Sequence, residues 1–287
     1  ADITKAKNMA YMLVSGGKEA KDYLEDFGSY VNGQLDYNLN PDFNGRKTGD
    51  DITDINDRIY GDNDVMGDRD HAKHGTHVAG IIAQTRHNNI GGDGVASKNV
   101  AIMSVRAVPD GDEYDKDIAL GIRYAVDNGA KVINGSFGKY FAQNSQWVYD
   151  AIKYAADKDV LIVVAAGNDA MDLNPKGEEI KRYPNDRIEG TNKEVADNFL
   201  VVGALNPSFG EKMVANFSNF GDIDVDVFAP GVKIYATTPH GKYEYLQGTS
   251  MASPNAAGVA AMIRSYYPNL KASQVKRIMM DSGVAVN

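Results

Sequence analysis

The sequence predicts an α/β fold in which helices cover both faces of a mostly parallel sheet. From about residue 99 onward, short apolar runs of strand length alternate with longer segments of helical periodicity. Such alternation is typical of βαβ units, whose strands are buried on both faces and therefore read as nearly continuous apolar runs. A chain of 287 residues with 43% hydrophobic residues can also bury a large core.

The elements can be assigned in order along the chain. The predicted strands cover 99–108, 131–138, 160–168, 199–205 and 225–232, and the predicted helices cover 115–129, 145–159, 250–268 and 271–283. In the helix over 115–129, residues Ile118, Ile122, Ala125 and Val126 share one face. Pro254 is tolerated near a helix start, because N–H groups of the first turn have no intrahelical partner. We therefore expect the helix over 250–268 to begin close to Ser250.

The first 70 residues differ in character from the rest. Residues 1–33 read as helical with a break at Gly16-Gly17, and residues 36–70 are rich in turn formers. The stretch 50–70 carries eight aspartates against two arginines. We interpret residues 1–70 as a helical and acidic-loop elaboration that forms part of an insertion, and residues 71–287 as one α/β domain.

Charge and hydropathy exclude several function classes. A formal net charge of −9 repels phosphate backbones, so we expect no nucleic-acid partner. The longest apolar runs, such as VLIVVAA at 160–166, are far shorter than the roughly 20 residues of a membrane-spanning helix, so we expect no membrane insertion. There are no cysteines, which excludes disulfides and thiolate metal sites. The first residues lack a signal-peptide pattern, and we expect the chain to begin after a segment has been removed.

Ser250 is the candidate nucleophile. It lies in GTSMASP, at the junction between a loop and a helix N-terminus. A hydroxyl there is close to unpaired backbone donors and to the positive end of the helix dipole, which favours developing negative charge. The simpler interpretation is that Ser250 only caps its helix. A matching base elsewhere in the chain is needed to decide between the two.

His74 is the candidate base, at the opening of a helix whose buried face is Val78, Ile81 and Ile82. A lone histidine is commonly a surface or satisfied side chain, and that alternative stays open. A metal site formed by His71, His74 and His77 is disfavoured, because zinc hydrolases of the HExxH type need a four-residue separation and a glutamate.

Asn168 is the third candidate. It ends the run VVAAGND, where a buried strand reaches its carboxyl end, and active sites of open parallel sheets lie at that edge. Its side-chain amide could donate a hydrogen bond to an oxyanion, although an asparagine that ends a strand is often only a turn residue. Each signal is weak alone, but the three in this order within an α/β pattern are specific.

The chain resembles the subtilisin-like serine peptidases. The matching motifs are HGTHVAG at 74–80, AAGN at 165–168 and GTSMASP at 248–254, with VINGSFG, FSNFGDIDVDVFAPG and YATTP in support. The resemblance extends from about residue 60 to the end of the chain. It implies a three-layer subtilisin-like fold with a mostly parallel central sheet, and a serine endopeptidase that forms an acyl-enzyme on a polypeptide substrate.

The resemblance also implies a role for each site residue. Ser250 is then the nucleophile, His74 the general base and Asn168 the oxyanion donor. One wall of the substrate cleft is expected from Ser136, Phe137 and Gly138, and the other from Ala165, Ala166 and Gly167. An extended peptide is expected to pair with these edges. The resemblance further implies an exported enzyme, secreted, periplasmic or at the cell surface, that requires no cofactor.

The pattern departs from the family at the catalytic aspartate. The triad order in this family is Asp, His, Ser, and the aspartate should end a buried strand upstream of His74. No such stretch occurs, and the DSG at 281–283 follows the serine and a charged helix. We expect the aspartate strand to lie upstream of residue 1. Without that carboxylate the base is poorly oriented, and we expect activity to fall by about 10⁴.

Two other functions come into consideration from the sequence. An α/β-hydrolase esterase fails on residue order, because that fold needs a histidine after the serine and the last histidine is His240. The main rival is a catalytically inactive subtilase fold that binds peptides or proteins. The acidic stretch 50–70 could hold a structural calcium ion, but a solvated acidic loop fits its spacing better. Oligomeric state and side-chain preference are not predicted.

Overall fold

The computed structural model describes residues 28, 31–40, 42, 48–108, 111, 113–174, 181–188, 191 and 193–284. The chain divides into two compact units. The first comprises Ala1–Gly49 with Val108–Asp112, and the second comprises Asp50–Ala107 with Glu113–Asn287. In the first unit, the described residues include a short π-helix, Gln34–Asn38. The prediction of helix for residues 1–27 lies outside the described residues.

The second unit contains the predicted parallel sheet. Its four strands are β1 (Val132–Gly135), β2 (Leu161–Ala165), β3 (Phe199–Leu205) and β4 (Val227–Pro230), in the spatial order β1-β2-β3-β4. All three pairings are parallel, for example Asn134 with Val163 and Val163 with Leu200. Four of the five predicted strands are thus confirmed.

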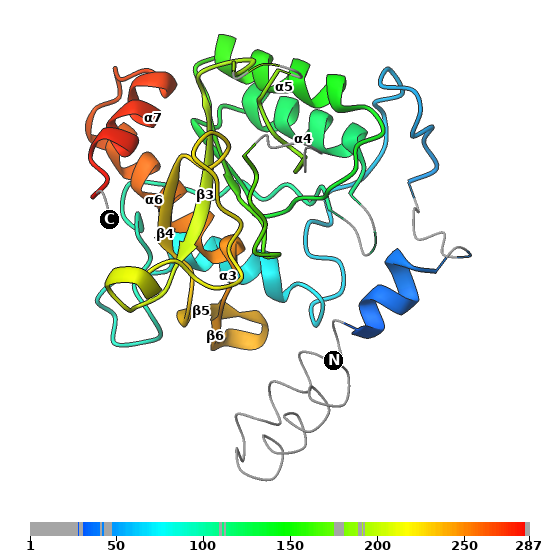
Figure 1. Ribbon diagram of the computed structural model, residues 1–287. Helices are drawn as coiled ribbons and strands as arrows, with labels where there is room; N and C mark the ends of the chain where they lie inside the picture. Colours follow the sequence, from blue (N-terminus) through cyan, green and yellow to red (C-terminus); the bar gives the residue numbers. More distant parts are fainter. Residues whose placement is uncertain are drawn as a thin grey trace. The chain divides into compact units, whose positions relative to one another are not determined.

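Helices lie on both faces of this sheet (Figure 1). They are α3 (Lys73–Ala83), α4 (Asp115–Asp127), α5 (Ser145–Asp157), α6 (Thr249–Tyr266) and α7 (Ala272–Asp281). Helix α6 contacts all four strands, and α5 contacts both β2 and α4. The predicted three-layer α/β architecture is confirmed, as are the helices predicted over 115–129, 145–159, 250–268 and 271–283.

The main core lies between the sheet and the helices α6 and α7. Leu161 and Val163 of β2 pack there with Leu200 and Val202 of β3 and with a row of alanines on α6, and all are fully or almost fully buried. Side chains alternate along a strand, so Ile162 and Val164 face the opposite side, where they are equally buried. The continuous apolar run of β2 is explained by this burial on both faces.

A hairpin of two antiparallel strands supports the helix that carries His74. The strands are β5 (Ile234–Thr238) and β6 (Lys242–Leu246), and the sequence pattern did not predict them. Helix α3 packs on β5 and on α6. Gly80 makes this close approach possible, since a Cβ at that position would lie 2.1 Å from Oγ1 of Thr237. A small core of Ile81, Ala236 and Met251 joins the three elements.

The strand predicted over 99–108 is wrong. Residues 100–107 form no strand, and the apolar side chains of Ile102, Met103 and Val105 are exposed. This segment runs beside α4, because a Cβ at Gly121 would lie 3.4 Å from Cβ of Ala107. Among the described strands, β1 pairs only with β2. The segment therefore has the apolar composition of a buried strand but no hydrogen-bonded neighbour.

The acidic stretch 50–70 is held mainly by its own carboxylates and by one buried lysine. Carboxylates accept hydrogen bonds from backbone N–H groups two residues further on, as in Asx turns, at Asp51, Asp54, Asp62 and Asp68. Lys116 of α4 donates to Asp50 Oδ2 and to the carbonyl oxygen of Asp51, both at 2.6 Å. The Lys116 ammonium also lies 4.6 Å from the ring centre of Tyr60.

The ion pair between Lys116 and Asp50 yields a stability prediction. Both side chains are only 1% exposed, so removing one partner leaves a buried charge uncompensated. We expect Lys116→Met to lower the free energy of unfolding by about 3–5 kcal/mol in urea denaturation. The double variant Lys116→Met/Asp50→Asn should lose clearly less than the sum of the two single changes. Strict additivity would contradict a coupled buried pair.

Candidate active site

Ser250 lies in the first turn of α6, close to the end of β1. Its hydroxyl donates to the carbonyl oxygen of Ser136 at 3.3 Å, and the hydroxyl of Ser136 donates to the carbonyl oxygen of Ser250 at 2.8 Å. Pro254, four residues on, has no N–H to bond that carbonyl, and Ser136 takes the vacant position. The expectation that Pro254 lies in the opening turn is therefore corrected. The missing helical bond is replaced by one that ties the serine to the sheet.

Asn168 follows β2, and Thr249 holds its side chain. Its Oδ1 accepts from the backbone N–H of Thr249 at 2.8 Å and from the Thr249 hydroxyl at 2.9 Å. The amide nitrogen Nδ2 has no hydrogen-bond partner within the described part of the chain. A Cβ on Gly248 would lie 3.5 Å from this Nδ2 and 3.7 Å from the backbone N of Ser250. The Asn168 amide and the backbone N–H of Ser250 thus both lie close to Gly248, at the start of α6.

The two predicted cleft walls differ in the backbone groups that they offer. On the wall formed by Ala165, Ala166 and Gly167, the carbonyl oxygens of Ala166 and Gly167 both accept hydrogen bonds from Asn219 at 2.9 Å. Strand pairing by a peptide along this wall is therefore not favoured. On the wall formed by Ser136, Phe137 and Gly138, the N–H of Gly138 donates to the carboxylate of Glu113 at 2.9 Å. A peptide can replace such a side-chain contact.

His74 lies in the first turn of α3, and its side chain is exposed. Nevertheless, surrounding protein atoms displace part of its hydration, and this desolvation lowers the pKa of His74, as does the charge of His77. Among the described residues, no carboxylate raises the pKa of His74 and no group hydrogen-bonds to its ring. In particular, His74 and Ser250 share no hydrogen bond, although their helices pack together through Ile81 and Met251.

The three histidines near the start of α3 have different environments. His77 is fully buried, and its Nε2 lies 3.1 Å from the carbonyl oxygen of Glu244 in β6. His71 and His74 are exposed. In the portion of the chain that the structure describes, no group of three or more His, Cys, Asp or Glu side chains is arranged to hold a metal ion. The geometry of these histidines supports a structural role for His77.

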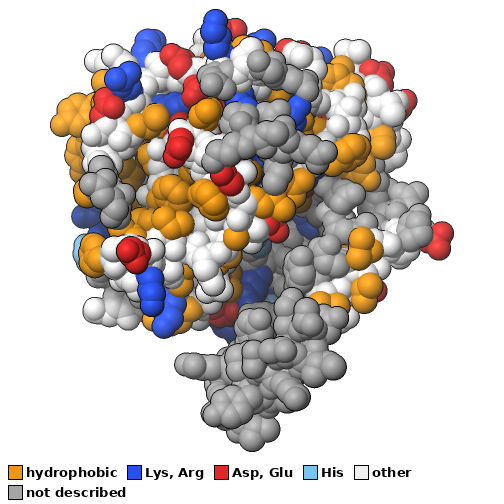
Figure 2. Space-filling view, in the orientation of Figure 1, with side chains coloured by type: hydrophobic (Ala, Val, Ile, Leu, Met, Phe, Trp, Pro, Cys, Tyr) orange, Lys and Arg blue, Asp and Glu red, His pale blue; other side chains and the backbone are white. Residues whose placement is uncertain are grey.

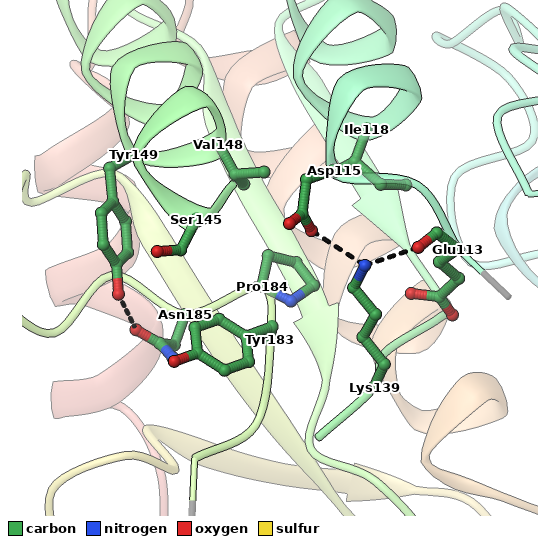
Figure 3. A pocket seen from close by; sticks show the side chains of 10 residues that line it. All are labelled: Glu113, Asp115, Ile118, Lys139, Ser145, Val148, Tyr149, Tyr183, Pro184 and Asn185. Carbon is green, nitrogen blue, oxygen red and sulfur yellow. Dashed lines mark hydrogen bonds and ion pairs between the residues drawn. The ribbon is translucent and has the colours of Figure 1, made fainter. Parts of the chain in front are cut away.

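A small pocket lies between α4, α5 and the segment around Pro184, and it contains none of the predicted site residues (Figure 3). Its polar side chains pair with one another. Lys139 forms an ion pair with Asp115 at 2.9 Å, and the Tyr149 hydroxyl donates to Asn185 at 3.0 Å. We assign no catalytic role to these residues.

The structure brings most of the predicted site together around the start of α6. Ser250 contacts Ser136, and Asn168 contacts Thr249, whereas His74 lies on the adjacent helix α3 without a hydrogen bond to Ser250. Sequence reasoning missed two contributors. Thr249 lies inside the motif GTSMASP, and its place beside the serine could have drawn attention to it. Arg182, which lies against Gly138, belongs to no pattern that sequence reasoning could use.

The chain thus places a serine in the opening turn of α6, a histidine in the opening turn of α3 and the side chain of Asn168 against Thr249, on a parallel α/β sheet. The model of the subtilase family, Peptidase_S8, matches residues 33–286. The chain belongs to the subtilase family, as its motifs indicated.

Individual relatives agree with this assignment. The chain is 37% identical over 204 residues to Subtilisin DY of Bacillus licheniformis, which covers 71% of this chain and 67% of that protein. It is 38% identical over 234 residues to the Thermophilic serine proteinase of Bacillus sp. (strain AK1), covering 80% of this chain but only 50% of the relative. Among solved structures, the S41 Psychrophilic Protease matches with a TM-score of 0.63 and 33% identity, covering 78% of this chain and 72% of that one.

The environment of His74 yields a pH prediction. Its pKa is lowered from 6.5, so the neutral imidazole that a base requires should persist below pH 6.5. We expect an NMR titration of the imidazole, assigned with His74→Gln, to give a midpoint below 6.5. A nearby carboxylate would stabilise the imidazolium and raise the midpoint, so a value of 7 or above would contradict the environment described here.

Proposed function

We propose that this chain is the peptidase part of a serine endopeptidase that hydrolyses polypeptides through an acyl-enzyme. Ser250 is the nucleophile, His74 the general base, and Asn168 Nδ2 and the backbone N–H of Ser250 are the oxyanion donors. The observation that carries the proposal is the side chain of Asn168, held by Thr249 next to Ser250, with its amide nitrogen and the backbone N–H of Ser250 both close to Gly248. Helix α6 adds the positive end of its dipole at this point.

The proposed reaction has two halves. The Ser250 oxygen attacks the peptide carbonyl carbon while its proton passes to His74, and the carbonyl oxygen becomes an oxyanion held by the two donors. The C–N bond then breaks, and His74 returns the proton to the leaving amine. Water attacks the resulting ester by the same route, which releases the acid and restores the Ser250 hydroxyl.

We further propose that the chain by itself is impaired. No carboxylate among the described residues acts on His74, so the tautomer and orientation of its ring are not fixed. The Ser250 hydroxyl donates to Ser136 and not to a base. On the triad template, loss of the carboxylate lowers turnover by about 10⁴.

The missing carboxylate and the incomplete sheet have a common solution. An extended segment at the outer edge of β1 would pair with that strand, and the exposed Ile102, Met103 and Val105 offer apolar surface for it to cover. If that segment ends in an aspartate at the carboxyl edge of the sheet, it places a carboxylate on the side where the site lies. We propose that such a segment activates His74.

The second candidate is a catalytically inactive subtilase fold that binds peptides or proteins. Two observations favour it. No described carboxylate acts on His74, and the Ser250 hydroxyl donates to a carbonyl oxygen and not to a base. The wall formed by Ser136, Phe137 and Gly138 could bind a peptide without cleaving it.

The remaining proposals concern location, cofactors and partners. We propose an exported protein, supported by relatives such as the Cell wall-associated protease of Bacillus subtilis, of which this chain spans 23%. No described helix is long and apolar enough to cross a membrane. On the face drawn in Figure 2, Lys and Arg are scattered among acidic and apolar side chains, which does not favour a nucleic-acid partner. The proposed chemistry needs no cofactor, and a structural calcium ion at the acidic stretch stays a prediction.

Fluorophosphonate labelling tests the nucleophile. We expect Ser250 to react slowly and Ser250→Ala not to react. Asn168→Ala should slow labelling by about 10²–10³, a magnitude taken from the oxyanion donor of subtilisin, a relative of this chain. Ser265→Ala, which removes a half-buried serine near the other end of α6, should label like the parent. Intact-mass spectrometry against time gives the rates.

Casein hydrolysis tests the impairment. We expect turnover to rise by about 10⁴ when a strand-forming segment that ends in an aspartate is joined to the N-terminus. Full turnover by the 287-residue chain would refute the proposal that it lacks a carboxylate acting on His74. Absence of labelling in both versions, together with retained peptide binding, would favour the inactive binding fold.

A further inference from the structure

Arg182 is buried against one wall of the proposed cleft. Arg182 is only 5% exposed, and its Nη2 donates a hydrogen bond to the carbonyl oxygen of Phe137 at 2.6 Å. A Cβ on Gly138 would lie 2.5 Å from Nη2 and 2.9 Å from both Cζ and Nε of Arg182. The guanidinium thus occupies the space that a side chain at position 138 would fill. Glycine at this position is required for the contact.

The charge of Arg182 has no ion-pair partner among the described residues. Nη1 donates to the carbonyl oxygen of Pro184 at 2.9 Å, and Nε is buried without any partner. Burial lowers the pKa of Arg182 to about 10, and Glu113 and Tyr140 offset this only in part. Buried arginines are normally paired with carboxylates, because an unpaired buried charge is costly. Such an arrangement beside a cleft is a recognised sign of a functional group.

Arg182 lies close to the wall that would face the substrate residue whose carbonyl Ser250 attacks. Ser136, which contacts Ser250, precedes Gly138 by two residues, a distance of roughly 7 Å along an extended chain. On the opposite wall, a Cβ on Gly167 would lie 3.0 Å from the Tyr140 hydroxyl, and Tyr140 and Arg182 act electrostatically on each other. Arg182 therefore lies directly behind Gly138, on the wall that begins at Ser136, the residue in contact with Ser250.

We propose that Arg182 selects an acidic side chain, glutamate or aspartate, at the substrate residue whose carbonyl Ser250 attacks. This inference rests on the proposed peptidase function and names its substrate class. A substrate carboxylate that reaches the guanidinium would compensate its buried charge through a charge-assisted hydrogen bond. The glutamine side chain has nearly the same shape but no charge, so peptides with glutamate should bind clearly more tightly than peptides with glutamine.

The competing interpretation is that Arg182 only braces the fold by joining Phe137 to Pro184. A brace of this kind would not distinguish a glutamate from a glutamine in a bound peptide. The ratio of the two affinities therefore separates selectivity from a structural role. Because it is measured by binding, it does not depend on turnover.

The test uses product-like tetrapeptides, acetyl-Ala-Ala-Pro-X with X as Glu, Gln or Leu, titrated calorimetrically into the full chain. We expect Glu to bind at least about tenfold more tightly than Gln, the effect of one charge-assisted hydrogen bond. Arg182→Gln should bring the two within about twofold. Arg187→Gln is the matched control, because Arg187 lies nearby in sequence but is paired with Asp224 at 3.0 Å. It should keep the preference for Glu.

If Arg182→Gln does not fold, Glu113→Gln replaces it. That change removes a negative charge that acts on Arg182, and the preference for Glu should increase. Equal or absent binding of the Glu and Gln peptides by the parent chain would overturn the inference, as would a Glu preference that survives Arg182→Gln. Failure of the proposed peptidase function would show separately, as absence of fluorophosphonate labelling at Ser250.

Discussion

The unpaired edge of β1 is the constraint on which the rest of this structure depends. Parallel strands are normally buried on both faces and paired on both sides, because their backbone groups need partners and their side chains are apolar. Among the described strands, β1 has only β2 beside it, and Val132, Ile133 and Asn134 are only half-buried. In the described part of the chain, the exposed side chains of Ile102, Met103 and Val105 and the absence of a carboxylate acting on His74 both agree with the proposal that a further segment pairs with β1.

The nucleophile side of the site is held by contacts within the described residues. Ser250 is tied to the end of β1 through Ser136, and Asn168, after β2, is fixed through Thr249, so both depend on the strand ends and the start of α6. These elements enclose the best-packed core of the molecule. The helix that carries His74 packs on the β5–β6 hairpin and on α6, but no described group hydrogen-bonds to the His74 ring. The geometry is therefore well defined at the serine and poorly constrained at the histidine.

Sequence reasoning succeeded where the signal was periodic and failed where it depended on a partner. The four confirmed strands and the four helices predicted after residue 99 have strong apolar patterns, and Ser250 and Asn168 are correctly placed at helix and strand ends. Residues 99–108 have the same apolar pattern, but a strand also needs a hydrogen-bonded neighbour, which no local pattern reveals. The β5–β6 hairpin was missed because its alternation is weak. Arg182 was missed because its importance comes from burial against Gly138, which lies 44 positions earlier in the sequence.

The separation between the two halves of the site has a consequence for specificity. Arg182 and the wall that it lies against belong to the well-packed half, together with Ser250 and Asn168. On these proposals, the peptide-selecting wall is present without any segment beside β1. Proton transfer by His74 requires that segment, because it would supply the carboxylate. A chain in this state can recognise a peptide and still cleave it slowly. Binding and turnover would then respond to different parts of the molecule, binding to Arg182 and turnover to whatever pairs with β1.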